Sequence, residues 1–492
     1  MDQPWKMLVY ISADNTLYQD AQISLRQLTE ASSSNNVDII VQFDGPSPGD
    51  GSRYKCVGGK KELLWEADNQ YAKKGRPQRL SDFLNSDEAV PKVSTATPPE
   101  RQRIALVLWG HGAGLDHFYF YNKPKPAKEN KTKRATAVAA KDSQSPTVAD
   151  PNRYVKNIQL GKILEEHTEG IRSHYPEEIR SQYPEEVNFK IDLLGLDSCL
   201  MALVEICHEV SASVSLMVAS DEVVPDSSWP YDSILGDLNK FPGMDANTLS
   251  AVIINRFRER YTQKRRKTRV SLSSMNLQGS DALVEAMEEL VKVLDTATNQ
   301  KNDPAGTAKR IIFRARDASR TPDEATYIDF GVFCQELSQS FSQEHVEESK
   351  RNPGHADVSD RAKNVHDMLV RSPYVIYHRD AGEDGSIDPY GLAIYFPPTL
   401  DLITSKIDAE LKPEVMPRND VKTPGVAGGK TPGVRGGKDT AGLLITGYEI
   451  LWHDYHELAF NKKTRWAKLI YRLLGGHPTK YCSDKKCLIL NK

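Results

Sequence analysis

The sequence predicts an α/β fold with a mainly parallel central sheet and a mostly helical C-terminal region. Apolar runs of strand length alternate with helical patterns from the start of the chain, and such alternation is typical of βαβ units. Two of these runs end directly on residues with reactive side chains, at the edge where open parallel sheets bind ligands. The 492 residues are enough for two or three domains of ordinary size.

The first half of the chain supplies most of the predicted sheet. Strands are expected over residues 8–12, 37–43, 104–109, 189–197 and 214–220. Helices are expected over residues 19–31 and from about Leu200 onward, before the last of these strands. We therefore assign residues 1–245 to a first α/β core.

The second half continues this body. Helices are expected over residues 247–261, 281–294 and 328–341, and a strand over residues 270–274. The apolar positions of the second helix recur at helical spacing, which indicates core packing; they are Leu283, Met287, Leu290, Val291 and Leu294. Residues 246–400 are accordingly interpreted as a continuation of the α/β body.

Three stretches depart from this alternation. Residues 122–151 are basic and rich in Pro, which predicts a mobile surface loop. Residues 171–186 hold two copies of an eight-residue pattern, too few for a solenoid, so an expanded surface loop is expected. Residues 421–438 repeat a Pro- and Gly-rich pattern that predicts a flexible tether.

The tether opens the last predicted region, residues 401–492. Helices are expected there over residues 448–461 and 464–474. Their aromatic residues predict that this segment docks on the main body; they are Trp452, Tyr455, Phe460, Trp466 and Tyr471.

The most informative residues follow two of the predicted strands. Cys199 ends the run over residues 189–199, and His111 follows the run over residues 104–109. Strands that lie side by side would bring the two side chains together as a Cys/His dyad. A thiol needs a base or a positive neighbour to become a thiolate near neutral pH, and imidazole supplies either.

Two backbone amides at these turns are candidate hydrogen-bond donors to the oxyanion that forms during acyl transfer. Gly112 has no side chain to obstruct its amide, so the amides of Gly112 and Cys199 are candidate oxyanion donors. Each residue also has a structural interpretation: His111 as a strand-end histidine, and Asp197 as the N-cap of the helix expected near Leu200. Cys56, Cys207 and Cys334 are expected to be small buried apolar residues.

The order of several motifs resembles that of the clostripain-like cysteine peptidases. The motifs are the opening run over residues 5–15, the turn over 109–112, the run over 197–202 with Glu205, the run over 229–231 and the run over 390–397. The resemblance implies a caspase-like α/β sandwich of three layers and peptide hydrolysis after a basic residue. It also implies the roles of His111 as general base and acid, Cys199 as nucleophile and Gly112 as oxyanion donor.

The resemblance further implies that Asp197 lies at the base of the pocket for the substrate's Arg or Lys. A guanidinium or ammonium group that enters a partly desolvated pocket needs a carboxylate partner. The sequence departs from the family pattern over residues 225–229, where glycines are expected at the positions of Asp226 and Ser228. Asp226 is a second candidate acid for the same pocket.

The basic loop over residues 122–151 lies between His111 and Cys199 and is rich in the residues after which such an enzyme would cut. We therefore expect self-cleavage within it, with Lys133, Arg134 and Lys141 as candidate sites. The two resulting chains would stay associated. The alternative is that the loop is only a solvated linker.

Bulk properties restrict the class of protein. The net charge of −3 argues against a dedicated nucleic-acid surface, and no nucleic-acid-binding motif is present. No apolar run approaches a membrane span, and the first residues do not form a signal peptide. The chain as given is therefore expected in the cytoplasm, and outside the cell only if a leader has been removed.

The sequence gives only weak indications of a metal ion or a cofactor. The six cysteines do not suggest a disulfide scaffold, and Cys482 and Cys487 with His477 would be an incomplete zinc site. We therefore assign no metal ligands. No organic cofactor is required, and calcium is an option that the resemblance leaves open without an EF-hand-type spacing of acids.

The sequence therefore predicts a cysteine endopeptidase that hydrolyses peptide bonds after Arg or Lys. Its partners would be peptide or protein substrates that contain these residues, and it would be a monomer or a self-processed two-chain form. Two other functions stay open: a catalytically silent caspase-like module for binding or assembly, and a peptide ligase that uses the same dyad.

Overall fold

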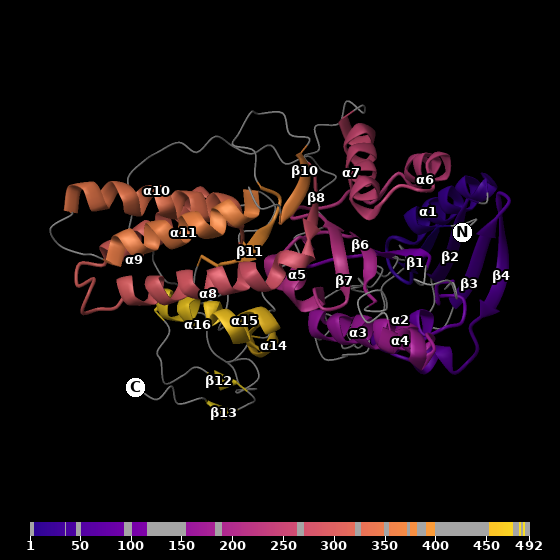
Figure 1. The fold of residues 1–492 in the computed structure, drawn as a ribbon, viewed down its shortest axis with the longest axis horizontal. Helices are drawn as coiled ribbons and strands as arrows, with labels where there is room; N and C mark the ends of the chain where they lie inside the picture. Colours follow the sequence, from indigo (N-terminus) through magenta and orange to yellow (C-terminus); the bar gives the residue numbers. More distant parts are fainter. Residues whose placement is uncertain are drawn as a thin grey trace, which may run out of the picture.

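The fold is that of a computed structural model (Figure 1). It describes residues 4–34, 36–45, 51–92, 101–115, 154–182, 189–262, 270–319, 326–348, 354–370, 374–380, 390–398, 452–475, 482–483 and 486–487. The candidate self-cleavage residues Lys133, Arg134 and Lys141, and the whole tether over residues 421–438, lie outside these ranges.

A large sheet organises the molecule. Within the described residues it has nine strands in the order β10-β8-β7-β6-β5-β1-β2-β3-β4. The central strands pair in parallel; they are β1 (Trp5–Ser12), β2 (Val37–Asp44), β5 (Arg103–Trp109), β6 (Ile191–Asp197) and β7 (Val214–Ala219). All eight residues of β1 are buried, as expected for a strand covered on both faces.

The direction of pairing changes at both edges of this sheet. On one side β3 (Gly51–Val57) and β4 (Lys60–Glu66) add antiparallel strands. On the other side β8 (Ser271–Asn276) and β10 (Val375–Asp380) do the same. The sequence analysis predicted β8 but missed β3, β4 and β10. β4 is mostly exposed and begins with two lysines, a composition that discourages pairing with other chains at an edge.

Helices cover both faces of the sheet, which gives three layers (Figure 1). One layer contains α1 (Tyr18–Ala31), α6 (Tyr231–Lys240) and α7 (Ala246–Thr262). The other contains α2 (Arg76–Leu84), α3 (Asn157–Ser173), α5 (Val204–Val210) and α8 (Ser280–Ala297), with the short α4 (Glu177–Gln182) next to α3. The predicted α/β sandwich with a mainly parallel core is confirmed.

A group of helices packs beyond the end of the sheet that β10 forms. It contains α9 (Thr307–Ala318), α10 (Phe330–Glu348) and α11 (Gly354–Val370). The short strands β9 (Tyr327–Asp329) and β11 (Ala393–Tyr395) pair with each other beside them. The run over residues 390–397 therefore contributes to this second, small sheet.

The C-terminal helices dock on the main body, as the aromatic residues predicted. They are α14 (Trp452–Glu457), α15 (Ala459–Thr464) and α16 (Trp466–Leu473). The hydroxyl of Tyr455 donates to Glu205 on α5 at 3.2 Å, and the indole nitrogen of Trp466 donates to the carbonyl of Tyr395 at 2.9 Å. Burial raises the pKa of Glu205 to about 7. The short strands β12 (Cys482–Ser483) and β13 (Lys486–Cys487) set the two cysteines opposite each other along the backbone.

Most predicted elements are confirmed within a few residues, and the differences have local causes. The helix expected near Leu200 begins instead at Val204, with Leu203 as its N-cap, so the N-cap interpretation of Asp197 is wrong. The helix expected from residue 328 begins at Phe330, because the Asp329 carboxylate accepts from the amide of Val332 and caps it.

Two further predictions are corrected. The stretch over residues 171–186, expected to be a surface loop, is mostly helical where it is described: α3 runs to Ser173, a short turn follows, and α4 covers Glu177–Gln182. The helix expected over residues 448–461 is divided at Leu458 into α14 and α15. Cys56, Cys207 and Cys334 are buried, as predicted.

Within the part of the chain that is described, no helix is both long enough and apolar enough to cross a membrane.

Candidate active site

The pairing of β5 with β6 brings His111 and Cys199 to the same edge of the sheet. Trp109 and Asp197 are paired residues at the ends of these parallel strands, and the amide of Gly110 donates to the carbonyl of Asp197 at 3.3 Å. His111 and Cys199 each come two residues after that pair. The structure therefore brings the predicted pair of residues to adjacent strand ends.

The sulfur of Cys199 lies against the segment that follows β7. The amide of Val224 donates to Sγ at 3.3 Å, and Sγ lies 3.7 Å from the carbonyl oxygen of the same residue. The side chain is 9% exposed, so a small opening to solvent remains. An amide N–H directed at sulfur makes a stronger hydrogen bond with a thiolate than with a thiol.

The turn after Cys199 has an unusual backbone. Leu200 has a φ of 62°, in the left-handed region that a bulky residue rarely adopts. Its amide donates to the carbonyl of Glu222 at 3.1 Å, and the amide of Ala202 donates to Ser220 at 2.9 Å. Such strain is found where the surrounding structure over-determines a conformation, often at active sites.

Gly112 lies directly against this turn. A methyl group on Gly112 would be 2.4 Å from the carbonyl oxygen of Cys199 and 3.0 Å from its amide nitrogen. Only glycine fits at this distance without a backbone shift. The two residues predicted to supply oxyanion amides are therefore neighbours.

Contacts from later in the chain hold the loop after β5. The hydroxyl of Tyr327 accepts from the amide of Leu115 at 2.8 Å and lies 3.3 Å from the carbonyl of Ala113. The side chain of Asn157 donates to the carbonyl of Gly114 at 3.1 Å. These contacts fix the path of the backbone that carries His111.

Asp197 is a buried acid at the end of β6, two residues before Cys199. One of its carboxylate oxygens, Oδ2, accepts from the hydroxyls of Ser228 and Tyr231 and from the amide of Trp229, the last two at 2.7 and 3.3 Å. Its other oxygen, Oδ1, is buried and has no hydrogen-bond partner among the described residues. One oxygen of this carboxylate is thus saturated with hydrogen bonds, and the other is buried without a donor.

Burial raises the pKa of Asp197 to about 6, and the hydrogen bonds and the charge of Arg260 act in the opposite direction. The carboxyl group is neutral below this pH and charged above it. A cation that donates to Oδ1 would favour the charged form further.

The departure from the family pattern at Ser228 has a structural explanation. Ser228 has a φ of 59°, the left-handed conformation for which glycine is the usual residue. Its hydroxyl donates to Asp197 and accepts from the indole nitrogen of Trp109 at 2.7 Å. The serine therefore keeps the turn that glycine would give and adds a hydrogen bond to the buried acid.

Asp226 has a different environment from Asp197. It is exposed, and its charge acts on Asp20 at the start of α1, where burial and Asp226 together raise the pKa. The two acids grouped by the sequence analysis are thus a buried one and a surface one. Within the described residues, no cluster of three or more His, Cys, Asp or Glu side chains is placed to hold a metal ion.

Comparison with known families gives a direct result. The model of the clostripain family matches residues 177–472, which is more than half of the chain and includes Asp197 and Cys199.

The chain belongs to the clostripain family.

The clostripain family is a family of cysteine peptidases, and the expected caspase-like sandwich agrees with membership in it. No curated protein matches the chain by sequence. Among solved structures, a secreted C11 cysteine protease from Bacteroides thetaiotaomicron, with a peptide inhibitor, is 14% identical with a TM-score of 0.49. The match covers 80% of this chain and 93% of that one.

A second solved structure is an inactive zymogen C11 protease from Parabacteroides distasonis. It is 14% identical with a TM-score of 0.46, and the match covers 81% of this chain and 93% of that one.

Sequence reasoning missed several residues around the clostripain-family dyad. Thr16 contacts His111, and Ser228 and Tyr231 donate to Asp197. Trp109 donates to Ser228, and Tyr327 accepts from the amide of Leu115 in the loop after β5. Trp109 and Tyr231 lie in motifs that carried the resemblance, so the motifs contained their signal. Thr16 and Tyr327 are hydroxyl residues far along the chain from His111, and nothing local marks them.

The closeness of Gly112 to Cys199 generates a prediction. We expect Gly112→Ala to lower kcat/KM for peptide substrates by roughly 100-fold or more, because the new methyl group displaces an amide proposed to face the oxyanion. Steady-state peptide hydrolysis and thermal unfolding of the same preparations would measure it. Gly170→Ala, on α3 with open space around its Cβ, is the matched control and should keep full activity. Full activity of Gly112→Ala would contradict the oxyanion assignment.

Proposed function

We propose that this clostripain-family protein is a cysteine endopeptidase that cleaves after Arg or Lys through a dyad of Cys199 and His111. The observation that carries the proposal is the register of β5 and β6, which sets both residues two positions beyond one strand pair. The unpartnered oxygen of buried Asp197 supports the basic specificity.

In the first step the thiolate of Cys199, whose proton His111 has taken, attacks the carbonyl carbon of the scissile bond. The oxyanion that forms would face the amides of Gly112 and Cys199, whose backbones are in contact. The carbon–nitrogen bond then breaks, and His111 gives a proton to the leaving amine. The product of this step is a thioester of Cys199.

In the second step His111 takes a proton from water, which attacks the thioester and releases the acid. The imidazole thus works in turn as acid and as base, and positioned proton transfer is worth about 10²–10⁴-fold in rate. The partly exposed His111 ring has access to solvent for this step.

Asp197 would receive the side chain of the substrate's Arg or Lys. The three donors on Oδ2 fix the carboxylate, and Oδ1 is left for a cationic donor. An Arg or Lys side chain would supply the missing hydrogen bond and neutralise a buried charge at once. Asp226 is exposed in the segment that also carries Ser228 and Trp229, and it would act at most on a second basic residue of the substrate.

The first test is release of a fluorophore from short peptides that end in Arg, Lys, Asp or Leu. Wild type should cleave after Arg or Lys, and Cys199→Ala and His111→Ala should lower kcat by roughly the 10²–10⁴-fold of proton transfer or more. Assays with and without added calcium would test whether the ion is needed.

The other outcomes separate the alternatives. Joined products in the presence of an added peptide amine would indicate a ligase. Silence of reduced, processed wild type on every peptide, with or without calcium, would favour the binding or assembly module over the peptidase.

The pKa of Asp197 generates a second prediction. As pH falls through about 6 the carboxyl group becomes neutral, so KM for Arg and Lys peptides should rise. We expect Asp197→Asn to lower kcat/KM for these peptides by roughly 100-fold and to remove the rise in KM. Kinetics between about pH 5 and pH 8 would measure both effects.

Asp197→Asn should not lower the stability of the folded protein, although it lowers activity. Because the folded-state pKa of Asp197 is raised, the ionised acid costs stability above about pH 6, and Asp197→Asn should unfold at an equal or higher temperature at pH 7. Asp226→Asn, a change of an exposed acid in the segment over residues 225–229, should have a much smaller effect on kcat/KM. A larger effect of Asp226→Asn than of Asp197→Asn would reverse the assignment of the pocket acid.

Self-cleavage is a further part of the proposal, with Lys133, Arg134 and Lys141 as the candidate sites. Their position between the two dyad residues and their basic side chains support it. Intact-mass measurement of wild type should show two chains cut after one of these residues, and Cys199→Ala should stay intact. Equal fragments in both proteins would mean that another protease cuts the loop.

A further inference from the structure

The imidazole of His111 has a partner from the start of the chain. The hydroxyl oxygen of Thr16 lies 3.1 Å from Nε2 of His111, although the two residues are 95 positions apart. Thr16 follows β1 and His111 follows β5, and these strands are neighbours in the sheet. In the sheet β1 lies between β2 and β5, so the chain crosses from β1 to β2 on one side and returns with β5 on the other. The contact therefore lies at the topological switch point, where such sheets bind ligands.

The turn that carries Thr16 is held by the residue before it. The side chain of Asn15 donates to the carbonyl of Ser12 at 2.9 Å and accepts from the amide of Leu17 at 2.9 Å. Asn15 is buried, so both ends of its amide are used within the turn. This pattern fixes the backbone on either side of Thr16.

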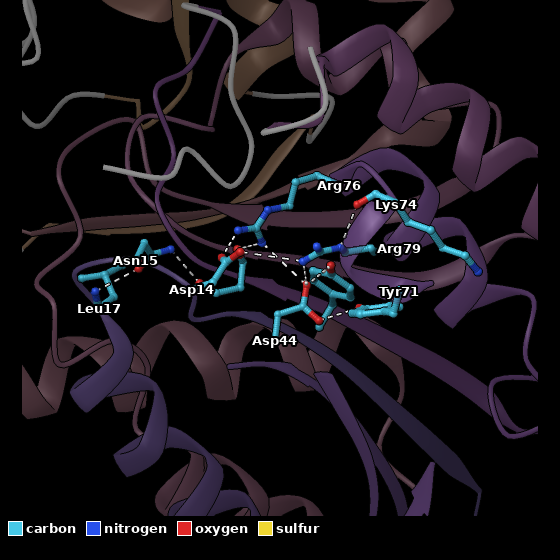
Figure 2. A network of polar contacts seen from close by, with 10 residues as sticks. Asp14, Asn15, Leu17, Asp44, Tyr71, Lys74, Arg76 and Arg79 are labelled. Atoms are coloured by element: carbon cyan, nitrogen blue, oxygen red, sulfur yellow. Dashed lines mark hydrogen bonds and ion pairs between the residues drawn. The ribbon is translucent and has the colours of Figure 1, made fainter. Parts of the chain in front are cut away.

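A buried group of charges holds the base of the same turn (Figure 2). Arg76 forms ion pairs with Asp14 and, at 3.7 Å, with Asp44, and it donates to the hydroxyl of Ser12. Arg79 lies 3.7 Å from a carboxylate oxygen of each of the two acids. Figure 2 shows both guanidinium groups between the two carboxylates.

The group is balanced in charge and tied to the sheet. Two arginines face two acids, and Asp44 also accepts from the hydroxyls of Tyr10 and Tyr71 at 2.7 and 2.6 Å. Burial lowers the pKa of Arg76 to about 10, which leaves it charged at neutral pH. Because removal of one partner would leave a buried charge uncompensated, the network holds Asp14, and with it the Thr16 turn, in one position.

We propose that Thr16 is a positioning residue of the active site, whose hydroxyl holds the His111 ring through Nε2. This inference rests on the proposed function of His111 as the acid and base of peptide hydrolysis. The hydroxyl can pair with Nε2 in either tautomer, so the contact holds the ring orientation; when Nε2–H is the donor, the lone pair lies on Nδ1, and Nδ1 is the nitrogen that exchanges protons with the substrate. Thr16 itself touches no reacting atom.

The chemistry gives this role a specific signature. Cleavage of an amide needs a proton on the leaving amine, which His111 supplies as the carbon–nitrogen bond breaks. A nitrophenyl ester with the same acyl group has a leaving group that departs as an anion and does not need that proton. A residue that only orients His111 should therefore affect amide cleavage more than ester cleavage, whereas general distortion of the site should lower both.

The test compares Thr16→Val, Thr16→Ser and wild type on an Arg peptide amide and the matching nitrophenyl ester. We expect Thr16→Val to lower kcat/KM for the amide by roughly 10-fold to 100-fold, a part of the contribution of positioned proton transfer. For the ester, kcat/KM should change by less than about threefold, and Thr16→Ser should keep nearly full activity on both because it keeps the hydroxyl.

The matched control is Thr296→Val, on the exposed surface of α8, where the hydroxyl bonds only the carbonyl of Lys292 among the contacts described. It should match wild type on both substrates. An unchanged amide rate in Thr16→Val, or an equal loss on amide and ester, would overturn the inference while wild-type cleavage upholds the proposed function. If wild type cleaves neither substrate, the proposed function fails, and the inference with it.

Discussion

The register between β5 and β6 is the constraint on which the active site depends. The pairing of Trp109 with Asp197 brings His111 and Cys199 to one edge and puts the Gly112 backbone against Cys199. A slip of one residue would turn every side chain of a strand to the opposite face. The apolar residues of both strands are buried on each side, so packing forbids such a slip and thereby fixes the site.

Around Asp197 the fold accepts a cost in stability. Asp197 is a buried acid with one oxygen saturated and the other without a partner among the described residues. Ser228 is held in a left-handed conformation to donate to it, and Leu200 is strained in a similar way beside Cys199. Backbone strain and unpaired polar atoms often gather at active sites, and the surrounding core of the sandwich offsets their cost.

The central strands, and the strand ends that carry His111 and Cys199, could be predicted because their signals are local. Apolar runs of strand length and the residues that follow them are visible in a single stretch of sequence. The antiparallel edges were harder, because β3, β4 and β10 are more polar and their pairing is decided by neighbours. The helix expected near Leu200 begins later because contacts with Glu222 and Ser220 hold that segment in a turn.

The sequence by itself determined the α/β class, the strand ends that carry His111 and Cys199, and the family to which the chain is similar. Only the tertiary structure decided which groups surround them. Thr16 meets His111 across 95 positions, and Tyr455 reaches Glu205 across 250. Contacts at such separations depend on how the sheet orders its strands, a cooperative result of packing that no single stretch of sequence contains.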